Sequence, residues 1–338
     1  MLPTPEISVI LGNLQYDSHV FAAQVTRAML PAPNTARLMF PAAVSIEVVP
    51  GDNAQLTVTA GDNATVVLTG KVHTIEHRPH HTVVTLTDGT YDLCQYRPSA
   101  TFEKQNAMTI AQTLAADVQL QVGTVAIDLN LPQYAAHQKR TAAEHIAELA
   151  RFSDGFALVD GDGKLQVNNW SDGPADAAIK YGRDLMDFSF TQHHPLGAVA
   201  LIGNGPSGSA DAPNALRHDT GQLPESVAAP GKGVKWQAHP ILRTPSAVQT
   251  AQSGITRERN QRVGQALLVG LLRPDFVPGM KLEIQGVPAP NVGSTWVLTQ
   301  VQHELVHGSY AKTTLHARED ARAEDLLGSV LGAVGGLL

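Results

Sequence analysis

The chain has 338 residues, of which 43% are hydrophobic and 16% are charged, which is typical of a globular protein with two or three domains. Its formal net charge of -7 argues against a specific nucleic-acid-binding surface, because such a surface needs clustered Lys and Arg. Cys94 is the single cysteine, which excludes an intrachain disulfide, and no apolar run is long enough for a membrane span, so we expect a soluble protein made in the cytoplasm.

The first region, residues 1–97, has the pattern of consecutive β-strands. The tandem stretches GDNAQLTVTA and GDNATVVLTG, residues 51–60 and 61–70, each join a Gly-Asp-Asn turn to alternating β-branched and apolar residues. Further strands are predicted at residues 71–76 and 82–87, closed by a turn at Asp88 and Gly89. Many short strands at this spacing favour a small barrel or sandwich.

The middle region, residues 98–181, combines helices with strands. Asn106 can cap a helix whose apolar residues from Ala107 to Val118 form one continuous stripe. A second helix is predicted to begin with a capping box formed by Thr141 and Glu144. The following FALV, DGDG and KLQV segments predict a hairpin, so this region is expected to be a compact α+β unit.

A second β region is predicted at residues 182–318. Its first clear strand is AVALI, followed at residues 203–233 by a stretch dense in Gly, Pro, Ser and Ala that predicts a loop. A helix is expected at about residues 245–260, and strands resume with ALLVGLL, MKLEIQG and WVLTQVQHEL. The last residues, 319–338, form a separate C-terminal tail.

The segment HELVH, residues 303–307, matches the H-E-x-x-H signature of zinc proteases, which requires a helix that brings both His side chains to one metal ion. Here the flanking residues alternate as in a strand. One face is expected to carry Val297, Thr299, Val301, His303 and Leu305, and the other Gln300, Gln302 and Glu304. Two His four residues apart in a strand are separated by about 13 Å, too far to share one zinc ion. We therefore predict a half-buried strand histidine and no metal site.

Two other motifs are also weak. GNGPSG, residues 203–208, matches a dinucleotide fingerprint, but Pro206 and Pro213 bracket a loop where such a fold requires a helix. Asp160 to Lys164, DGDGK, resembles the start of a calcium loop but lacks the later ligands, so a hairpin turn is the better interpretation. We predict no catalytic, cofactor-binding or metal-binding residues and no cofactor, hence no enzyme.

The C-terminal strands carry the most specific resemblance to a known family. After the helix near residues 245–260 comes VPGMKLEIQG, with Pro278 and Gly279 opening a strand. The next pattern consists of Trp296, Leu298, Thr299, Val301 and His303, followed by Gly308, Tyr310, Thr313 and Leu315. Together with the middle segment RTAAEHIAELARFSDGFALVDGDGKLQV, this arrangement resembles the late control D family, the baseplate hub proteins of contractile phage tails.

That resemblance implies an α+β, mainly β protein in which two tube-like β-barrel domains flank the middle region. It implies a structural late protein of the virion baseplate, made in the host cytoplasm, whose homotrimeric ring joins the sixfold tail tube to the threefold central spike. The implied partners are other copies of itself, the spike protein, a tail tube or tube-initiator protein, other baseplate proteins and the tape measure protein, with no membrane and no specific nucleic acid. The alternatives are the hub of a related injection particle, such as a bacteriocin or a type VI-like system, and a tail-associated zinc peptidase or wall hydrolase.

The tail supplies one candidate partner-binding segment. Its glycines weaken a free helix and its apolar stretch is too short to cross a bilayer, so we expect it to dock on a neighbouring subunit or another baseplate protein. The apolar residues expected to be buried there are Leu326, Leu327, Val330, Leu331, Val334, Leu337 and Leu338.

Overall fold

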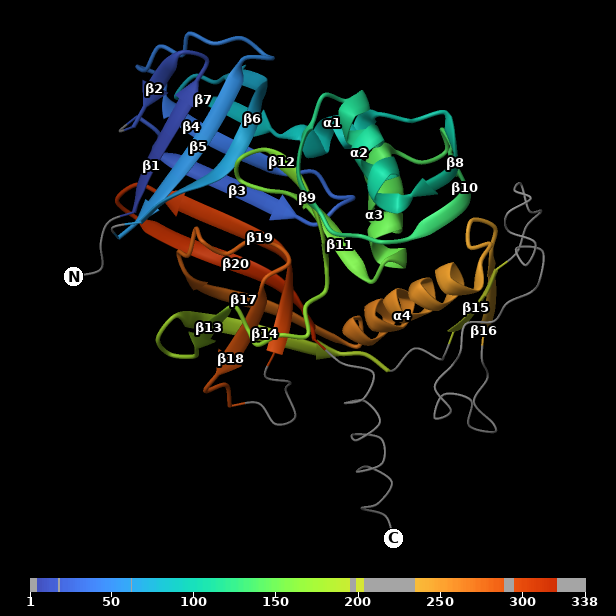
Figure 1. Ribbon diagram of the computed structural model, residues 1–338. Helices are drawn as coiled ribbons and strands as arrows, with labels where there is room; N and C mark the ends of the chain where they lie inside the picture. Colours follow the sequence, from blue (N-terminus) through green and yellow to red (C-terminus); the bar gives the residue numbers. More distant parts are fainter. Residues whose placement is uncertain are drawn as a thin grey trace.

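The computed structural model describes residues 5–17, 19–61, 63–194, 199–203, 235–288 and 295–320. Strands predominate, and the helices gather on one side of the molecule (Figure 1). The α+β, mainly β class expected from the sequence is confirmed. No helix among the described residues is both long and apolar enough to cross a bilayer.

The first β region is a run of antiparallel strands. The predicted hairpin at the second Gly-Asp-Asn stretch is confirmed. The two strands that it joins are antiparallel neighbours, with Ala60 opposite Asn63 beside the turn and Asn53 opposite Lys71 at the far end. The strands are β1 (Glu6–Leu11), β2 (Leu14–Tyr16), β3 (Ala22–Ala28), β4 (Thr35–Pro41), β5 (Asn53–Ala60), β6 (Asn63–His77) and β7 (His81–Thr87).

Two local predictions in this region need correction. Residues 71–76 form a strand as predicted, but they are the second half of β6 and not a separate strand; β6 changes its partner from β5 to β7 there, with a register irregularity between Val72 and Thr74. Asp88 does not close a turn, because its side chain accepts a hydrogen bond from the Thr90 backbone and caps a short helix. Turns and helix N-termini use the same Asp chemistry, so the local sequence fits both structures.

The middle region follows the predicted caps. Asn106 accepts a hydrogen bond from the Met108 backbone, and Thr141 and Glu144 form the expected capping box. The DGDG segment is a hairpin turn, with the Asp160 backbone N–H donating to the Lys164 carbonyl at 3.0 Å. The elements are β8 (Ala100–Asn106), α2 (Ala107–Asp117), β9 (Gln121–Val125), β10 (Asn130–Ala136), α3 (Ala142–Phe152), β11 (Gly155–Val159) and β12 (Lys164–Asn169). The short helix α1 (Gly89–Gln95) precedes them, at the end of the first region.

The predicted helix at residues 245–260 is α4 (Pro245–Gln261), with Thr244 as its cap and Pro245 at its first turn. Its apolar face, including Val248 and Ala251, belongs to the same hydrophobic core as α2 and α3. The same core receives β15 (Val199–Gly203), which pairs in parallel with β16 (Lys235–His239). Segments late in the chain therefore complete the core of the middle region.

The second β region also consists mainly of antiparallel strands. Its members are β14 (Leu185–Gln192), β17 (Gly264–Leu271), β18 (Lys281–Gln285), β19 (Thr295–Val306) and β20 (Tyr310–Glu319), and β13 (Ala177–Lys180), from the end of the predicted middle region, pairs with β18. β19 pairs with β20 on one side and with β3 on the other. One 13-stranded sheet therefore runs through both β regions, with β14 and β2 at the two ends of its main path.

Each β region nevertheless has its own apolar core. The first is built around residues such as Leu38, Leu56 and Leu86, and the second around Leu268, Leu298 and Leu315. Leu305 of β19 lies in the core of the first region, so the two regions share a strand and part of their packing. The division of the chain at residues 97, 181 and 318 stays a prediction.

A buried polar junction joins the first β region to the middle region. Asn34 donates to Asp88 at 2.7 Å and to the backbone carbonyl of Val159, in β11 of the middle region, at 3.3 Å. It accepts from the Ala28 backbone at 2.8 Å, and its own backbone N–H donates to the Thr90 hydroxyl. Burial raises the pKa of Asp88, against the opposing effect of the Thr90 and Asn34 hydrogen bonds. Because every member is buried and bonded, this network fixes how the two regions meet.

Candidate partner-binding cleft

The HELVH segment lies at the end of β19, so the strand prediction is confirmed. Val301, His303 and Leu305 are buried and alternate with the more exposed Gln302 and Glu304. An irregularity in the pairing with β20 lies between Leu298 and Gln300, so the predicted alternation does not extend back to Thr299. Among the described residues, no group of three His, Cys, Asp or Glu side chains is placed to hold a metal ion.

His303 is a fully buried, neutral core residue, so the half-buried position predicted for it was wrong. It lies between Val25 of β3 and Thr313 of β20 and is 0% exposed. Its Nδ1 is 3.0 Å from the Thr313 hydroxyl, which also accepts a hydrogen bond from the Arg273 backbone at 2.9 Å. Burial, helped by the nearby charge of Arg27, lowers the pKa of His303 to about 3, so the ring carries no charge at neutral pH.

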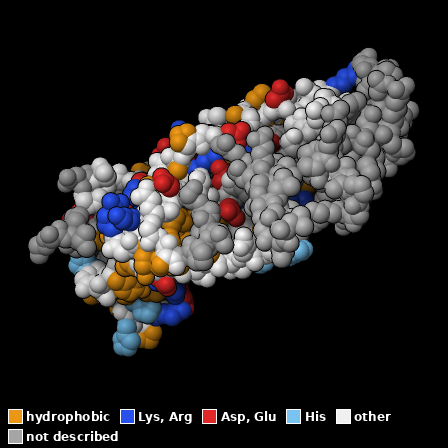
Figure 2. Space-filling view, turned by 90° about the horizontal axis from the view of Figure 1, so that it is seen from below, with side chains coloured by type: hydrophobic (Ala, Val, Ile, Leu, Met, Phe, Trp, Pro, Cys, Tyr) orange, Lys and Arg blue, Asp and Glu red, His pale blue; other side chains and the backbone are white. Residues whose placement is uncertain are grey.

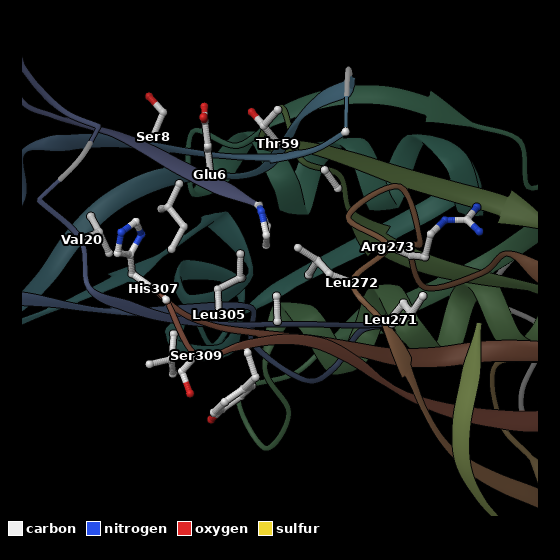
Figure 3. Close-up of a pocket in the computed structure, with 18 of the residues that line it drawn as sticks. Glu6, Ser8, Val20, Thr59, Leu271, Leu272, Arg273, Leu305, His307 and Ser309 are labelled. Atoms are coloured by element: carbon white, nitrogen blue, oxygen red, sulfur yellow. The ribbon is translucent and has the colours of Figure 1, made fainter. Parts of the chain in front are cut away.

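His307 follows the last residue of β19 and lines a different environment, a cleft of about 1080 Å³. One wall comes from β1 and the end of β5, and the other from the β19–β20 hairpin and the residues after β17 (Figure 3). Glu6 and Ser8 project from the first wall, whereas Leu305 and Ser309 belong to the second. The cleft therefore lies between the two β regions, next to the end of the β3–β19 pairing, where Leu305 and Val306 line it.

Both walls of the cleft contain strand segments with a partner on one side only. β1 pairs with β5 over its whole length, but with β2 only from Val9 to Leu11, which leaves residues 6–8 unpaired on that side. β20 pairs with β17 from Lys312 onward, so Tyr310 and Ala311 pair with β19 alone. Among the described strands, no ladder joins β1 to β20 across the cleft. Unpaired strand edges of this kind are templates for an added strand.

The charged groups of the cleft are fixed by short hydrogen bonds. Ser8 and Gln15 donate to the carboxylate of Asp17, and these bonds, in that order, lower its pKa. Arg273 is held by Asp275 through two hydrogen bonds of 2.9 and 2.7 Å. The cleft floor is apolar, with Ile7, Val20 and Leu305 buried beneath these groups. The unpaired strand edges of both walls, together with this apolar floor, favour an extended peptide segment as the occupant.

Most of the remaining predicted residues lie outside the described part of the chain. Gly203 ends β15, whereas the rest of the GNGPSG motif lies outside the described residues. The predicted loop at residues 203–233 lies almost wholly outside them, and so do the tail residues Leu326, Leu327, Val330, Leu331, Val334, Leu337 and Leu338.

No protein-family model and no curated protein matches this sequence. Solved structures do resemble it. The tail protein from Neisseria meningitidis MC58 has a TM-score of 0.70 at 14% identity, covering 94% of this chain and 97% of that one. The 43 kDa tail protein of prophage MuSo2 from Shewanella oneidensis has a TM-score of 0.68 at 13% identity, covering 94% and 99%. This protein has the fold of phage tail proteins.

A third structure extends the comparison beyond phages. The E. coli c3393 protein, described as a component of the type VI secretion system with structural similarity to the T4 tail proteins gp27 and gp5, has a TM-score of 0.61 at 12% identity. The alignment covers 91% of this chain and 76% of that chain. The tail-protein fold expected from the sequence is confirmed, whereas membership of the late control D family stays a prediction.

Sequence patterns do not reveal the cleft. Its walls come from the two ends of the chain, and no pattern within either end indicates that they face each other.

Proposed function

We propose that this protein is a structural hub of a phage-tail baseplate, in which three copies form a ring that joins the sixfold tail tube to the threefold spike. The proposal rests on one observation. A single sheet passes through both β regions, and among the described strands the two at its ends, β14 and β2, each have a partner on one side only. The nearly full-length likeness in fold to phage tail proteins supports it. Such a role needs no catalytic residue, and the protein would lie in the virion baseplate.

The β14 end of the sheet has the features of an assembly surface. Met186 on this strand is 51% exposed, Leu267 on the adjacent β17 is 40% exposed and Tyr181 nearby is 39% exposed. The ring of Phe188 lies between those of Tyr181 and Phe190, with distances of 5.1 and 5.2 Å between ring centroids. Figure 2, the view from below, shows hydrophobic side chains gathered with His and Lys or Arg side chains toward one end of this face. Exposed apolar groups beside a free edge favour pairing with another chain.

The β2 end of the sheet is similar. Leu14 is 44% exposed and Ile10 of β1 is 39% exposed, and β1 is the sole partner of β2 among the described strands. If the β2 end of one copy pairs with the β14 end of the next, the contact is head-to-tail, and such contacts close into a ring when the rotation allows it. Three copies would then cover both of these edges.

The cleft provides a second surface for assembly. We assign it to another tail component, namely the spike, the tail tube or tube initiator, another baseplate protein or the tape measure protein. An extended segment of that partner would pair with residues 6–8 and with Tyr310 and Ala311 while its apolar side chains cover the floor. The apolar residues of the C-terminal tail would dock on a neighbouring subunit.

The mass of the purified full-length chain in solution tests the ring. We expect a trimer by light scattering, with Met186→Lys or Leu14→Lys giving monomers because each places a charge on a pairing edge. Met108→Lys on α2, where Met108 is 37% exposed, is the matched control and should keep the trimer. A wild-type monomer that stays monomeric when mixed with the spike would contradict the proposal.

The hub of a related injection particle is the second candidate, because the c3393 protein of the type VI system shares the fold. Purifying intact particles and identifying their components separates the two: a phage tail carries a capsid, whereas a bacteriocin or type VI-like particle does not. The enzyme alternative, a zinc peptidase or wall hydrolase, predicts lytic activity of the pure chain on peptidoglycan.

A further inference from the structure

A second cavity lies where three parts of the molecule meet. Its volume is about 540 Å³, and it is lined by residues 28–32 between β3 and β4, by α3 and the end of α4, and by β19 and β20. We call it the junction cavity. It is separate from the partner-binding cleft, and none of the motifs in the sequence points to it.

The junction cavity contains buried hydrogen-bond donors that lack acceptors. Gln261 is 2% exposed, and its Nε2 has no partner among the described residues. The Nε of Arg151 is likewise buried without a partner in the described part of the chain. A buried donor that stays unpaired destabilises the folded protein, so native proteins normally satisfy such donors with water or an ion.

Arg318 adds a charge that no described residue neutralises. Its guanidinium is half-buried and forms no ion pair within 4.0 Å with the residues that the structure describes. Burial and the neighbouring charge of Arg262 lower its pKa, while Glu258 acts in the opposite direction. A buried cation beside a second cation attracts an anion.

The glutamates of the cavity already have partners. Glu148 lies 2.5 Å from Arg140 and 3.8 Å from Arg151, and Glu258 lies 2.5 Å from Arg262 and 3.6 Å from Arg151. Glu144 is engaged by the capping box of α3. With four arginines and three glutamates in the lining, one positive charge remains.

We propose that the junction cavity binds a small oxyanion, which accepts hydrogen bonds from Gln261, Arg151 and Arg318. Water could accept the hydrogen bonds of Gln261 and of Arg151, whose charge Glu148 and Glu258 already balance, but it cannot balance the charge of Arg318. The ligand would be phosphate-like if it comes from solution, or a carboxylate if an acidic side chain of a partner protein supplies it. Because the donors lie on α3, α4 and β20, the anion would link the middle region to the second β region.

Thermal unfolding of the full-length chain tests this site. We expect inorganic phosphate to raise Tm by about 4 °C over sodium chloride at the same ionic strength, with one binding site per chain by calorimetry. Acetate is the comparison for a carboxylate. A larger shift with phosphate indicates a free anion as the ligand, and a larger shift with acetate indicates an acidic partner side chain. No shift with either beyond that of chloride overturns the proposal, because the cavity then holds water only.

Two variants locate the effect. Arg318→Gln should abolish the phosphate-dependent or acetate-dependent shift, and Gln261→Glu should abolish it while raising Tm in chloride, because the new carboxylate supplies the missing acceptor in place. Arg183→Gln, an exposed arginine paired with Asp184, is the matched control and should keep the wild-type shift. A shift that persists in both cavity variants would place the anion elsewhere and overturn the assignment.

Discussion

At the scale of single residues, Gly161 shows how closely the DGDG hairpin approaches the first β region. A Cβ atom at this position would lie 2.1 Å from the backbone oxygen of Val66 on β6. A backbone atom cannot move aside as the tip of a side chain can, so Gly161→Ala should separate the hairpin from β6. We expect a loss of about 1–3 kcal/mol in the free energy of unfolding, measured by urea denaturation.

Gly173→Ala is the control for that experiment. A Cβ atom at position 173 would have the flexible Ser171 hydroxyl as its nearest neighbour, at 3.0 Å on an exposed turn. This change should alter the free energy of unfolding by less than about 0.5 kcal/mol. Equal effects of the two substitutions would mean that close packing against β6 is not what requires glycine at position 161.

The second prediction concerns His303, whose pKa is lowered to about 3 in the folded protein. The unfolded chain takes up a proton near pH 6.5 and the folded chain does not, so stability is full above that pH and declines as pH falls toward 3. Between pH 7.5 and 5.0 this residue should account for a loss of about 2 kcal/mol. His303→Gln should remove that part of the pH dependence in urea titrations at the two pH values.

His316→Gln, on the exposed side of β20, tests for general effects of exchanging His for Gln. It should keep the wild-type difference between the two pH values. The same preparations should contain no tightly held zinc by metal analysis, because His303 lies inside the strand and His307 beyond its end. One zinc per chain that disappears in His303→Gln would contradict this interpretation of the HELVH segment.

At the scale of elements, a buried ion pair fastens the end of β20 to β18. Lys281 and Asp320 are 4% and 6% exposed, with their charged atoms 2.6 Å apart. Lys281→Met should lower the free energy of unfolding by about 3–5 kcal/mol, because it leaves the carboxylate of Asp320 buried without its cation. The double variant Lys281→Met with Asp320→Leu should recover most of this loss.

The control is Arg183→Met, which removes an ion pair whose arginine side chain is 68% exposed. Exposed pairs contribute little, so the loss should stay below about 1 kcal/mol. If Lys281→Met is as mild as this control, the pair is screened by solvent and does not fasten the strand ends.

The elements that the sequence predicted well are those with local signals. Asn106 and Thr141 mark helix starts because their side chains accept hydrogen bonds from backbone N–H groups two and three residues further on. Pro245 marks the first turn of α4. The pairing of β3 with β19 has no such signal, because strand partners are selected by packing between distant segments. The same reason explains why the Asn34 junction and the partner-binding cleft were missed.

At the scale of the whole molecule, the tail tests the assembly proposal. Deleting residues 326–338 should leave the Tm of the isolated chain unchanged and weaken the incorporation of the protein into particles, because the apolar residues of the tail would be buried only against a partner. Thermal unfolding of the truncated chain and particle yield in a complementation assay measure the two effects. Wild-type yield from the truncated protein would contradict a docking role.

The shared sheet also constrains how the chain is made. β3 lies near the start of the chain, but its partner β19 and the core residue Leu305 come from the last fifth. At roughly 5–20 residues per second, the ribosome needs on the order of 10–60 seconds to synthesise the intervening chain. During that interval one edge of β3 stays open and the first core stays incomplete. A nascent chain in this state can pair with other nascent copies, so a host chaperone that shields β3 during synthesis should raise the yield of assembled protein more than one that acts after release.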